Sequence, residues 1–122
     1  MAGEPRPKLR FSRGARIKQR RDFLRLRQEG QRLAIGCLVV NWLGLPPGSH
    51  SRVGVITSRT IGNAVARNRA RRLMRETFRL HQHDLNQAID LVLVARQSIA
   101  GKAYPQVEQD FLTAMRKARL LK

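Results

Sequence analysis

Residues 61–79, IGNAVARNRARRLMRETFR, constrain the fold more than any other part of the chain. At about 100° per residue they form one helix with two unlike faces. The apolar face comprises Ala66, Ala70, Leu73, Met74, Thr77 and Leu80, with Phe78 at its border. The opposite face carries an i, i+4 row of arginines, widened by Asn68, Arg69 and Arg72; the row is Arg67, Arg71, Arg75 and Arg79. The segment predicts a helix that buries one side and presents cations on the other.

The cations of this helix lie close enough to repel one another, and only Glu76 supplies a negative charge nearby. An ordinary solvated helix face usually mixes signs, and it mixes lysine with arginine. Here every cation is arginine, whose planar guanidinium binds phosphate through two hydrogen bonds and stacks on bases. We therefore interpret this face as a surface that binds a polyanion.

The charge balance of the whole chain supports this interpretation. The 122 residues include 25 Lys and Arg against 8 Asp and Glu, a net charge of +17, which attracts nucleic acid or an anionic membrane. The apolar fraction of 42% is too high for a disordered basic tail. The longest apolar run, residues 33–40, is shorter than the roughly 20 residues that span a bilayer, and no apolar segment follows Met1. We expect a folded cytoplasmic protein with no membrane partner.

The first half of the chain predicts a flexible basic N-terminal arm at residues 1–16, followed by a single domain at residues 17–122. The domain begins with a helix from about Lys18 that stops at Gly30. A strand follows at residues 32–45, in which Gly36 marks a bulge or divides the run into two strands. After a turn rich in proline and glycine, residues 52–58 form another strand. The short turn predicts that these neighbouring strands pair antiparallel.

The second half adds a strand and a helix. Residues 89–95, IDLVLVA, form a nearly continuous apolar run that is typical of an interior strand covered on both faces. Residues 104–120 predict a helix with Pro105 in its first turn; its buried stripe is Val107, Phe111, Ala114, Met115 and Ala118. The order strand, helix, strand around the arginine-rich segment makes a crossover, whose default hand is right.

The groups that a hydrolytic enzyme needs are dispersed. No two acids share a motif suited to a metal pair, and His81 and His83 are two residues apart, the wrong spacing for one helix face. No glycine-rich phosphate loop is present. The single cysteine, Cys37, lies in an apolar run and is interpreted as a buried thiol. We expect no catalytic residue and no metal site in the chain.

The remaining function class is a binding protein. Helix-turn-helix and zinc signatures of duplex DNA readers are absent. Aromatic residues make up only 5% of the chain, too few for a stacking platform of several aromatics. Phosphate binding by arginine, with one or two stacked bases, is what the composition favours.

The stretch RVGVITSRTIGNAVARNRARRLMRETFR resembles the signature of the bacterial ribonuclease P protein family. The centre of that signature is an Arg-Asn-Arg element, here Arg67-Asn68-Arg69. Arg21-Asp22-Phe23 with Gly30 is similar to the family's first helix, and residues 90–96, DLVLVAR, are similar to its last strand and the arginine after it. The likeness covers roughly residues 18–118.

The resemblance implies a two-layer α+β fold, with a mixed, mostly antiparallel sheet of about four strands and three helices in the order α-β-β-β-α-β-α. It implies a left-handed βαβ crossover around the arginine-rich helix, against the default. It also implies the protein subunit of ribonuclease P, which assists a catalytic RNA in removing the 5′ leader from precursor tRNA. The RNA and the substrate hold the Mg²⁺ cofactor, the protein lowers the Mg²⁺ requirement, and no protein partner is needed.

The same resemblance implies two RNA-binding surfaces. One faces the catalytic RNA and comprises Arg59, Asn63, Arg67, Asn68, Arg69, Arg71, Arg72, Arg75 and Arg79. The other is a cleft for the single-stranded leader and comprises Lys18, Arg20, Phe23, Arg27, Asn41 and Arg96. Phe23 either stacks on a base or packs in the core. Because family members often carry aromatics where this chain has Arg27 and Asn41, we expect its leader binding to rely more on charge.

Three alternatives make different predictions. A ribosomal or assembly protein would bind ribosomal RNA at least as well as the ribonuclease P RNA. A protein-only nuclease would cleave precursor tRNA without added RNA. A DNA-compacting protein would follow charge alone and would ignore a leader.

Overall fold

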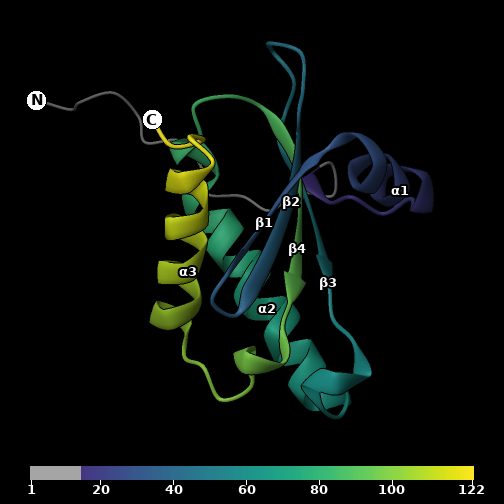
Figure 1. Ribbon diagram of the computed structural model, residues 1–122, viewed down its shortest axis with the longest axis vertical. Coiled ribbons are helices and arrows are strands. Elements are labelled where there is room, and N and C mark those ends of the chain that lie inside the picture. Colours follow the sequence, from purple (N-terminus) through teal and green to yellow (C-terminus); the bar gives the residue numbers. More distant parts are fainter. Residues whose placement is uncertain (1–14) are drawn as a thin grey trace, which may run out of the picture.

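The computed structural model describes residues 15–122, which form a four-stranded sheet with α2 and α3 on one face and α1 on the other (Figure 1). The elements are α1 (Arg20–Glu29), β1 (Gln31–Ile35), β2 (Leu38–Gly44), β3 (Arg52–Ile56), α2 (Ala64–His81), β4 (Ile89–Ala95) and α3 (Tyr104–Lys117). This confirms the predicted α+β class and element order. Within these residues no helix is long and apolar enough to cross a membrane.

The sheet has the strand order β1-β2-β4-β3. β2 pairs antiparallel with β1 and β4, whereas β3 pairs parallel with β4. The predicted antiparallel pair of residues 32–45 and 52–58 is therefore wrong, because β4 lies between those strands. The apolar run of β4 is buried on both faces only in this interior position. The predicted division at Gly36 is confirmed by its φ of 55°, in the tight turn between β1 and β2. The hand of the β3-α2-β4 crossover stays a prediction.

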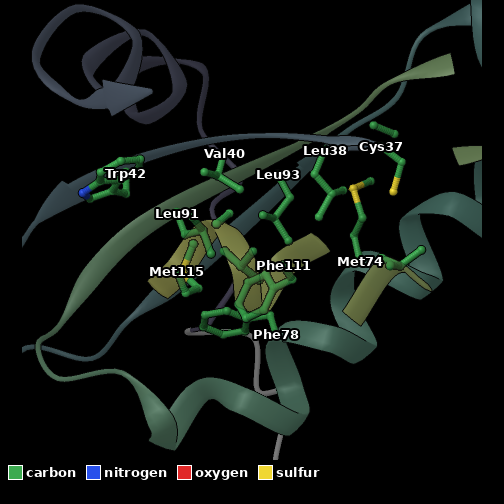
Figure 2. Close-up of a cluster of buried hydrophobic side chains, with 14 of the residues drawn as sticks. Cys37, Leu38, Val40, Trp42, Met74, Phe78, Leu91, Leu93, Phe111 and Met115 are labelled. Carbon is green, nitrogen blue, oxygen red and sulfur yellow. The ribbon is translucent and has the colours of Figure 1, made fainter. Parts of the chain in front are cut away.

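The main core lies between the sheet and the pair α2 and α3. Figure 2 shows Phe78, Phe111 and Met115 gathered against Leu91 and Leu93 of β4, and all five side chains are fully buried. The predicted apolar face of the arginine-rich helix is confirmed, since its fully buried members are Ala70, Met74, Thr77 and Phe78. The stripe of α3 is confirmed in the same way by Val107, Phe111, Ala114 and Met115. Burial of these stripes turns the arginines of α2 toward solvent.

The C-terminal end of α2 is tied to α3 by a charged cluster around His81. Its Nδ1 lies 2.8 Å from Asp84 Oδ2, its Nε2 lies 2.7 Å from Glu108 Oε2, and Tyr104 donates to the same Glu108 oxygen at 3.0 Å. The His81 ring also stacks on Phe111, with ring centroids 6.1 Å apart. Burial opposes ionisation of His81, but the hydrogen bonds to both carboxylates outweigh it and raise the pKa of the imidazole.

The opposite face of the sheet is only partly covered. A smaller core there comprises Ile17, Leu26 and Val92, with Phe23, Leu43 and Val94 packed against it. Helix α1 ends at Gly30 as predicted, and the reason is close packing: a Cβ on Gly30 would lie 2.5 Å from Leu26 O and 2.6 Å from Trp42 O. This approach fixes α1 over one part of the sheet and leaves the rest of that face open.

The predicted N-terminal arm falls mainly outside the described residues. Its last two residues belong to the domain, because Ala15 is buried and Arg16 forms an isolated parallel bridge with Val53 of β3. Ile17 N–H also donates to Val53 O at 2.9 Å. The chain thus runs along the outer edge of β3 before it enters α1.

Candidate nucleic-acid interface

Gly62 and Asn63 precede helix α2 and set the backbone geometry and hydrogen bonding of its first turn. Gly62 has a φ of 137°, a value that favours glycine, and Asn63 is the N-cap, whose Oδ1 accepts a hydrogen bond from Ala66 N–H at 2.9 Å. Arg67 Nη1 donates back to Gly62 O at 2.7 Å. Asn63, predicted as an RNA contact, therefore has a structural partner in the first turn of its own helix.

The exposed side of α2 gathers cations around one hollow. Five of the predicted RNA-binding residues line it and are called here the arginine face: Asn68, Arg71, Arg72, Arg75 and Arg79. Arg16 and Glu76 complete the lining. Glu76 is already engaged, because Arg79 donates to its two oxygens at 2.6 and 3.0 Å, and this hydrogen bonding lowers the pKa of the Glu76 carboxyl.

Like charges are crowded on the arginine face. Arg75 is half-buried, and both this burial and the nearby guanidinium groups of Arg16 and Arg71 lower the pKa of Arg75. Arg71 is oriented by Asn68, whose Oδ1 accepts from Arg71 Nη1 at 2.8 Å. A bound anion would relieve this repulsion, so binding of phosphate by this face stays a prediction that the geometry fits.

Four predicted residues lie outside this hollow. Arg59 is exposed in the 3₁₀ turn before α2, and Asn63 and Arg67 lie at the start of the helix. Arg69 lies on the other flank, where its Nη2 donates to Lys102 O at 2.7 Å, beside a small hollow that it shares with Arg72 and Tyr104. The predicted RNA-binding residues are therefore spread around the exposed half of α2 and do not form a single site.

A second hollow of about 320 Å³, called here the α1 cleft, lies between α1 and the open part of the sheet. Its apolar floor is continuous, because Val39 of β2, Val94 of β4 and Ile56 of β3 are direct neighbours across the strands. Ten residues line the cleft: Arg20, Phe23, Leu24, Arg27, Arg32, Val39, Asn41, Ile56, Val92 and Val94. It thus combines an apolar floor with a rim of arginines.

Phe23 packs on the sheet and lines the cleft at once. A Cβ on Gly54 of β3 would lie 2.7 Å from Phe23 Cε1 and 3.3 Å from Ile17 Cβ, so the ring rests directly on the strand backbone. The packing interpretation of Phe23 is therefore confirmed. Because the same ring also borders the cleft, base stacking stays a prediction.

Four of the six predicted cleft residues line the cleft, namely Arg20, Phe23, Arg27 and Asn41. Asn41 also has a structural role, since its Nδ2 donates to Leu26 O at 3.0 Å and Gln31 O at 2.8 Å. Lys18 and Arg96 are not among the residues that line the cleft, and their contact with a leader stays a prediction. Lys18 precedes α1 at the outer edge of β3, and Arg96 directly follows β4 at the end of the sheet where Val94 pairs with Val39, with its Nη1 donating to Gly36 O at 3.2 Å.

Sequence reasoning missed most of the cleft floor. Val92 and Val94 point to the α1 face because β4 alternates its side chains between the two faces. The run 89–95 is apolar except for Asp90, so the alternation that would separate a core face from a cleft face is hidden. Arg32 is missed for another reason: it pairs with Asn41 across β1 and β2, a register that the sequence does not specify.

A partly buried ion pair links α1 to the two strands β3 and β4. Arg52 of β3 donates from Nε and Nη2 to the two oxygens of Asp90 of β4, at 2.8 and 2.6 Å, and its Nη1 lies 3.6 Å from Asp22 of α1. Asp90 is only 3% exposed. The hydrogen bond to Asp90 raises the pKa of the Arg52 guanidinium. One arginine thus links α1, β3 and β4.

The carboxylates of the described residues all have partners. Seven of the eight acids, all but Glu4, lie within residues 15–122. Arg52 engages Asp22 and Asp90, Arg25 engages Glu29, Arg79 engages Glu76, His81 engages Asp84 and Glu108, and Asp110 accepts from Cys37 N–H. In the same part of the chain, no three His, Cys, Asp or Glu side chains are arranged to hold a metal ion. Because its acids are engaged within the protein, this part of the chain presents mainly cations to a polyanion.

An α+β domain with an arginine-covered helix and a cation-rimmed apolar cleft is a nucleic-acid-binding protein. The family model described as Ribonuclease P matches residues 11–119, so the chain belongs to the ribonuclease P protein family. It is a protein subunit of ribonuclease P, the endoribonuclease of tRNA processing in which RNA carries out the catalysis, and its partner is RNA.

Known proteins agree in sequence and structure. The chain is 34% identical to the ribonuclease P protein component of Gluconacetobacter diazotrophicus over 108 residues, which cover 87% of this chain and 92% of the relative. The component of Geobacillus sp. strain WCH70 is also 34% identical, covering 88% and 92%. Among solved structures, the Staphylococcus aureus RNase P protein matches with a TM-score of 0.80 and 30% identity, covering 88% of this chain and 98% of that one. The Thermotoga maritima protein matches with 0.74 and 28%, covering 84% and 96%.

Proposed function

We propose that this subunit binds the single-stranded 5′ leader of precursor tRNA in the α1 cleft and the catalytic RNA through the arginine face. The observation that carries the proposal is the composition of the cleft, an apolar floor with Arg20, Arg27 and Arg32 on its rim. Single-stranded RNA offers both matching parts, because its bases are free to leave the stack while its phosphates stay charged.

The cleft accounts for a preference for leader over duplex. Bases that are paired cannot turn toward the floor formed by Val39, Val94 and Ile56, whereas unpaired bases can lie on it. The rim arginines then bind the phosphates on either side. In this arrangement the ring of Phe23 is positioned to stack on one base, and its packing against Gly54 fixes the orientation of that ring.

The arginine face supports the second half of the proposal. Its cations bind phosphates of a folded RNA without reading base sequence. These cations screen the repulsion between the catalytic RNA and its substrate, a role that Mg²⁺ otherwise fills, so less Mg²⁺ is required. The Mg²⁺ that is still needed is held mainly by the two RNAs. Location in the cytoplasm and independence of a protein partner stay predictions.

The experiment that tests this function is cleavage of precursor tRNA at low Mg²⁺ by a bacterial ribonuclease P RNA, with and without this protein, and by the protein alone. We expect cleavage only when both components are present. Leader-bearing tRNA should bind the assembled particle more tightly than mature tRNA. A protein that stimulates nothing over a range of salt, but binds ribosomal RNA fragments, would overturn the proposal in favour of a ribosomal or assembly role.

A further inference from the structure

A third, smaller hollow lies between the two proposed RNA surfaces. It occupies about 160 Å³ at the outer edge of β3 and is lined by Arg16, Ile17, Lys18, Val53, Gly54, Val55 and Arg75. Arg16 and Arg75 also line the hollow of the arginine face, and Gly54 contacts Phe23 of the α1 cleft. The hollow therefore touches both surfaces.

The edge of β3 leaves part of its backbone directed into this hollow. β3 is the last strand of the sheet, and of the described residues before α1 only Arg16 pairs with it, through the isolated bridge to Val53. Val53 O points outward, because it accepts from Ile17 N–H at 2.9 Å. Since backbone groups alternate in direction along a strand, Val55 directs its N–H to the same outer side, just beyond that pairing.

We propose that this hollow, the β3-edge site, binds one backbone phosphate of the RNA strand that leads from the α1 cleft to the arginine face. The donors are the guanidinium groups of Arg16 and Arg75, the ammonium of Lys18 and the outward N–H of Val55. This inference rests on the proposed function and adds a site that joins its two surfaces into one path. It also gives Lys18, which is outside the cleft, a place on that path.

The chemistry of the lining selects a phosphate over a base. Three cations and no acid line the site, and none of its seven lining residues is aromatic, so a base would find no ring on which to stack. Arg16 is close enough to Arg75 to contribute, together with burial, to lowering the pKa of the Arg75 guanidinium. An oxyanion between them binds both and removes that repulsion.

The test is a series of precursor tRNAs, each with one neutral methylphosphonate in place of a phosphate between the distal leader and the cleavage site. For the wild-type particle we expect weaker binding at several positions. In Arg16→Ala/Lys18→Ala, binding of unmodified substrate should fall about tenfold. One methylphosphonate position should then lose its effect, while the others keep theirs.

The matched control is Arg116→Ala/Lys117→Ala, which removes the same two charges from the exposed end of α3. It should keep the wild-type profile at every position. If the double variant does not reach the wild-type unfolding temperature, Lys18→Ala alone gives the same test with Arg16 in place.

Each outcome decides a different claim. If the Arg16→Ala/Lys18→Ala profile matches the wild-type profile at every position, the β3-edge site is wrong and the proposed function stands. If no leader position affects wild-type binding, the leader-binding function itself is wrong. An equal loss of affinity in the control variant would show a general charge effect and overturn the site.

Discussion

The arginine face and the α1 cleft are built in opposite ways. The arginine face comes from one helix, so its residues are neighbours because of a spacing along the chain. The cleft takes its lining from α1 and all four strands, and its floor exists only because β4 lies between β2 and β3. A surface that comes from one helix can be predicted from the sequence, whereas a cleft assembled from several strands depends on the sheet topology.

The two surfaces also differ in the physical origin of their affinity. Cations that bind phosphates release counterions, so affinity for the arginine face falls steeply with salt. An apolar floor that holds bases contributes through stacking and burial, which salt affects far less. Variants of the two surfaces should therefore differ in salt dependence as well as in affinity.

The largest effect is expected at the ion pair beneath the cleft. Arg52→Ala leaves Asp90 buried without its partner, and we expect a loss of roughly 3–5 kcal/mol in the free energy of unfolding. Urea denaturation followed by circular dichroism measures this loss. Leader binding should be lost with it, because α1 loses its link through Asp22.

The double variant Arg52→Met/Asp90→Leu distinguishes the cost of an unpaired buried charge from the cost of lost packing. With no charge left buried, it should regain most of the lost stability. If the single variant loses less than about 1 kcal/mol, Asp90 gains access to water without Arg52 and the pair does not hold the cleft.

The next effect is on the exposed face of α2, at Arg71 of the arginine face and at Arg67, which lies just outside its hollow. Arg67→Ala/Arg71→Ala should weaken binding to the catalytic RNA by roughly 10- to 100-fold at matched salt and lower the salt slope by about 2, one for each phosphate contact. The fold should stay intact, because both side chains lie away from the buried stripe of α2. Filter binding over a salt series measures both values. Unchanged affinity in a folded variant would contradict the role of this face.

A smaller effect is expected inside the cleft. Phe23→Leu keeps an apolar side chain on Gly54 but removes the ring, so leader-bearing tRNA should bind about 5- to 10-fold more weakly, with the salt slope unchanged. Binding of mature tRNA serves as the control. If leader affinity does not change, Phe23 only packs, and the arginine rim carries leader binding.

The smallest effect concerns neither surface, and it tests the cluster that ties α2 to α3. Because the pKa of His81 in the folded state lies above 6.5, its contribution to stability is complete below pH 6.5 and is lost as pH rises through that raised pKa. The pKa of Glu108 is lowered by hydrogen bonds to His81 and Tyr104, so stability also falls as the pH drops below 4.5. The change from about pH 6 to about pH 8 should be no more than about 1 kcal/mol, visible as a few degrees in Tm. His81→Gln should remove this change, whereas His50→Gln in the exposed loop should keep it.

What the sequence predicted follows the same division between local and composite features. The arginine face and the buried stripes of α2 and α3 depend on periodicity within one segment, the interior strand β4 depends on an apolar run, and all were predicted. The pairing of β2 with β3 was predicted from a short turn and is wrong, because the sequence does not say that β4 fits between them. The omission of Val92 and Arg32 from the predicted cleft has the same cause. Which residues meet across strands is decided by strand order and register, which the spacing of residues in one segment does not encode.

The position of β4 also sets the order in which the sheet can assemble during synthesis. β1 and β2 pair across a tight turn as soon as residue 44 is free, but β3 has no strand beside it until β4 follows, more than 30 residues later. Helix α2 is made in that interval, before the strands that cover its apolar stripe can pair. For a time the nascent chain therefore carries its most basic segment without the core that supports it, a state in which both misfolding and premature contact with RNA are possible. Synthesis through residue 95 lets the sheet form against α2, and α3 then completes the core that covers its apolar stripe.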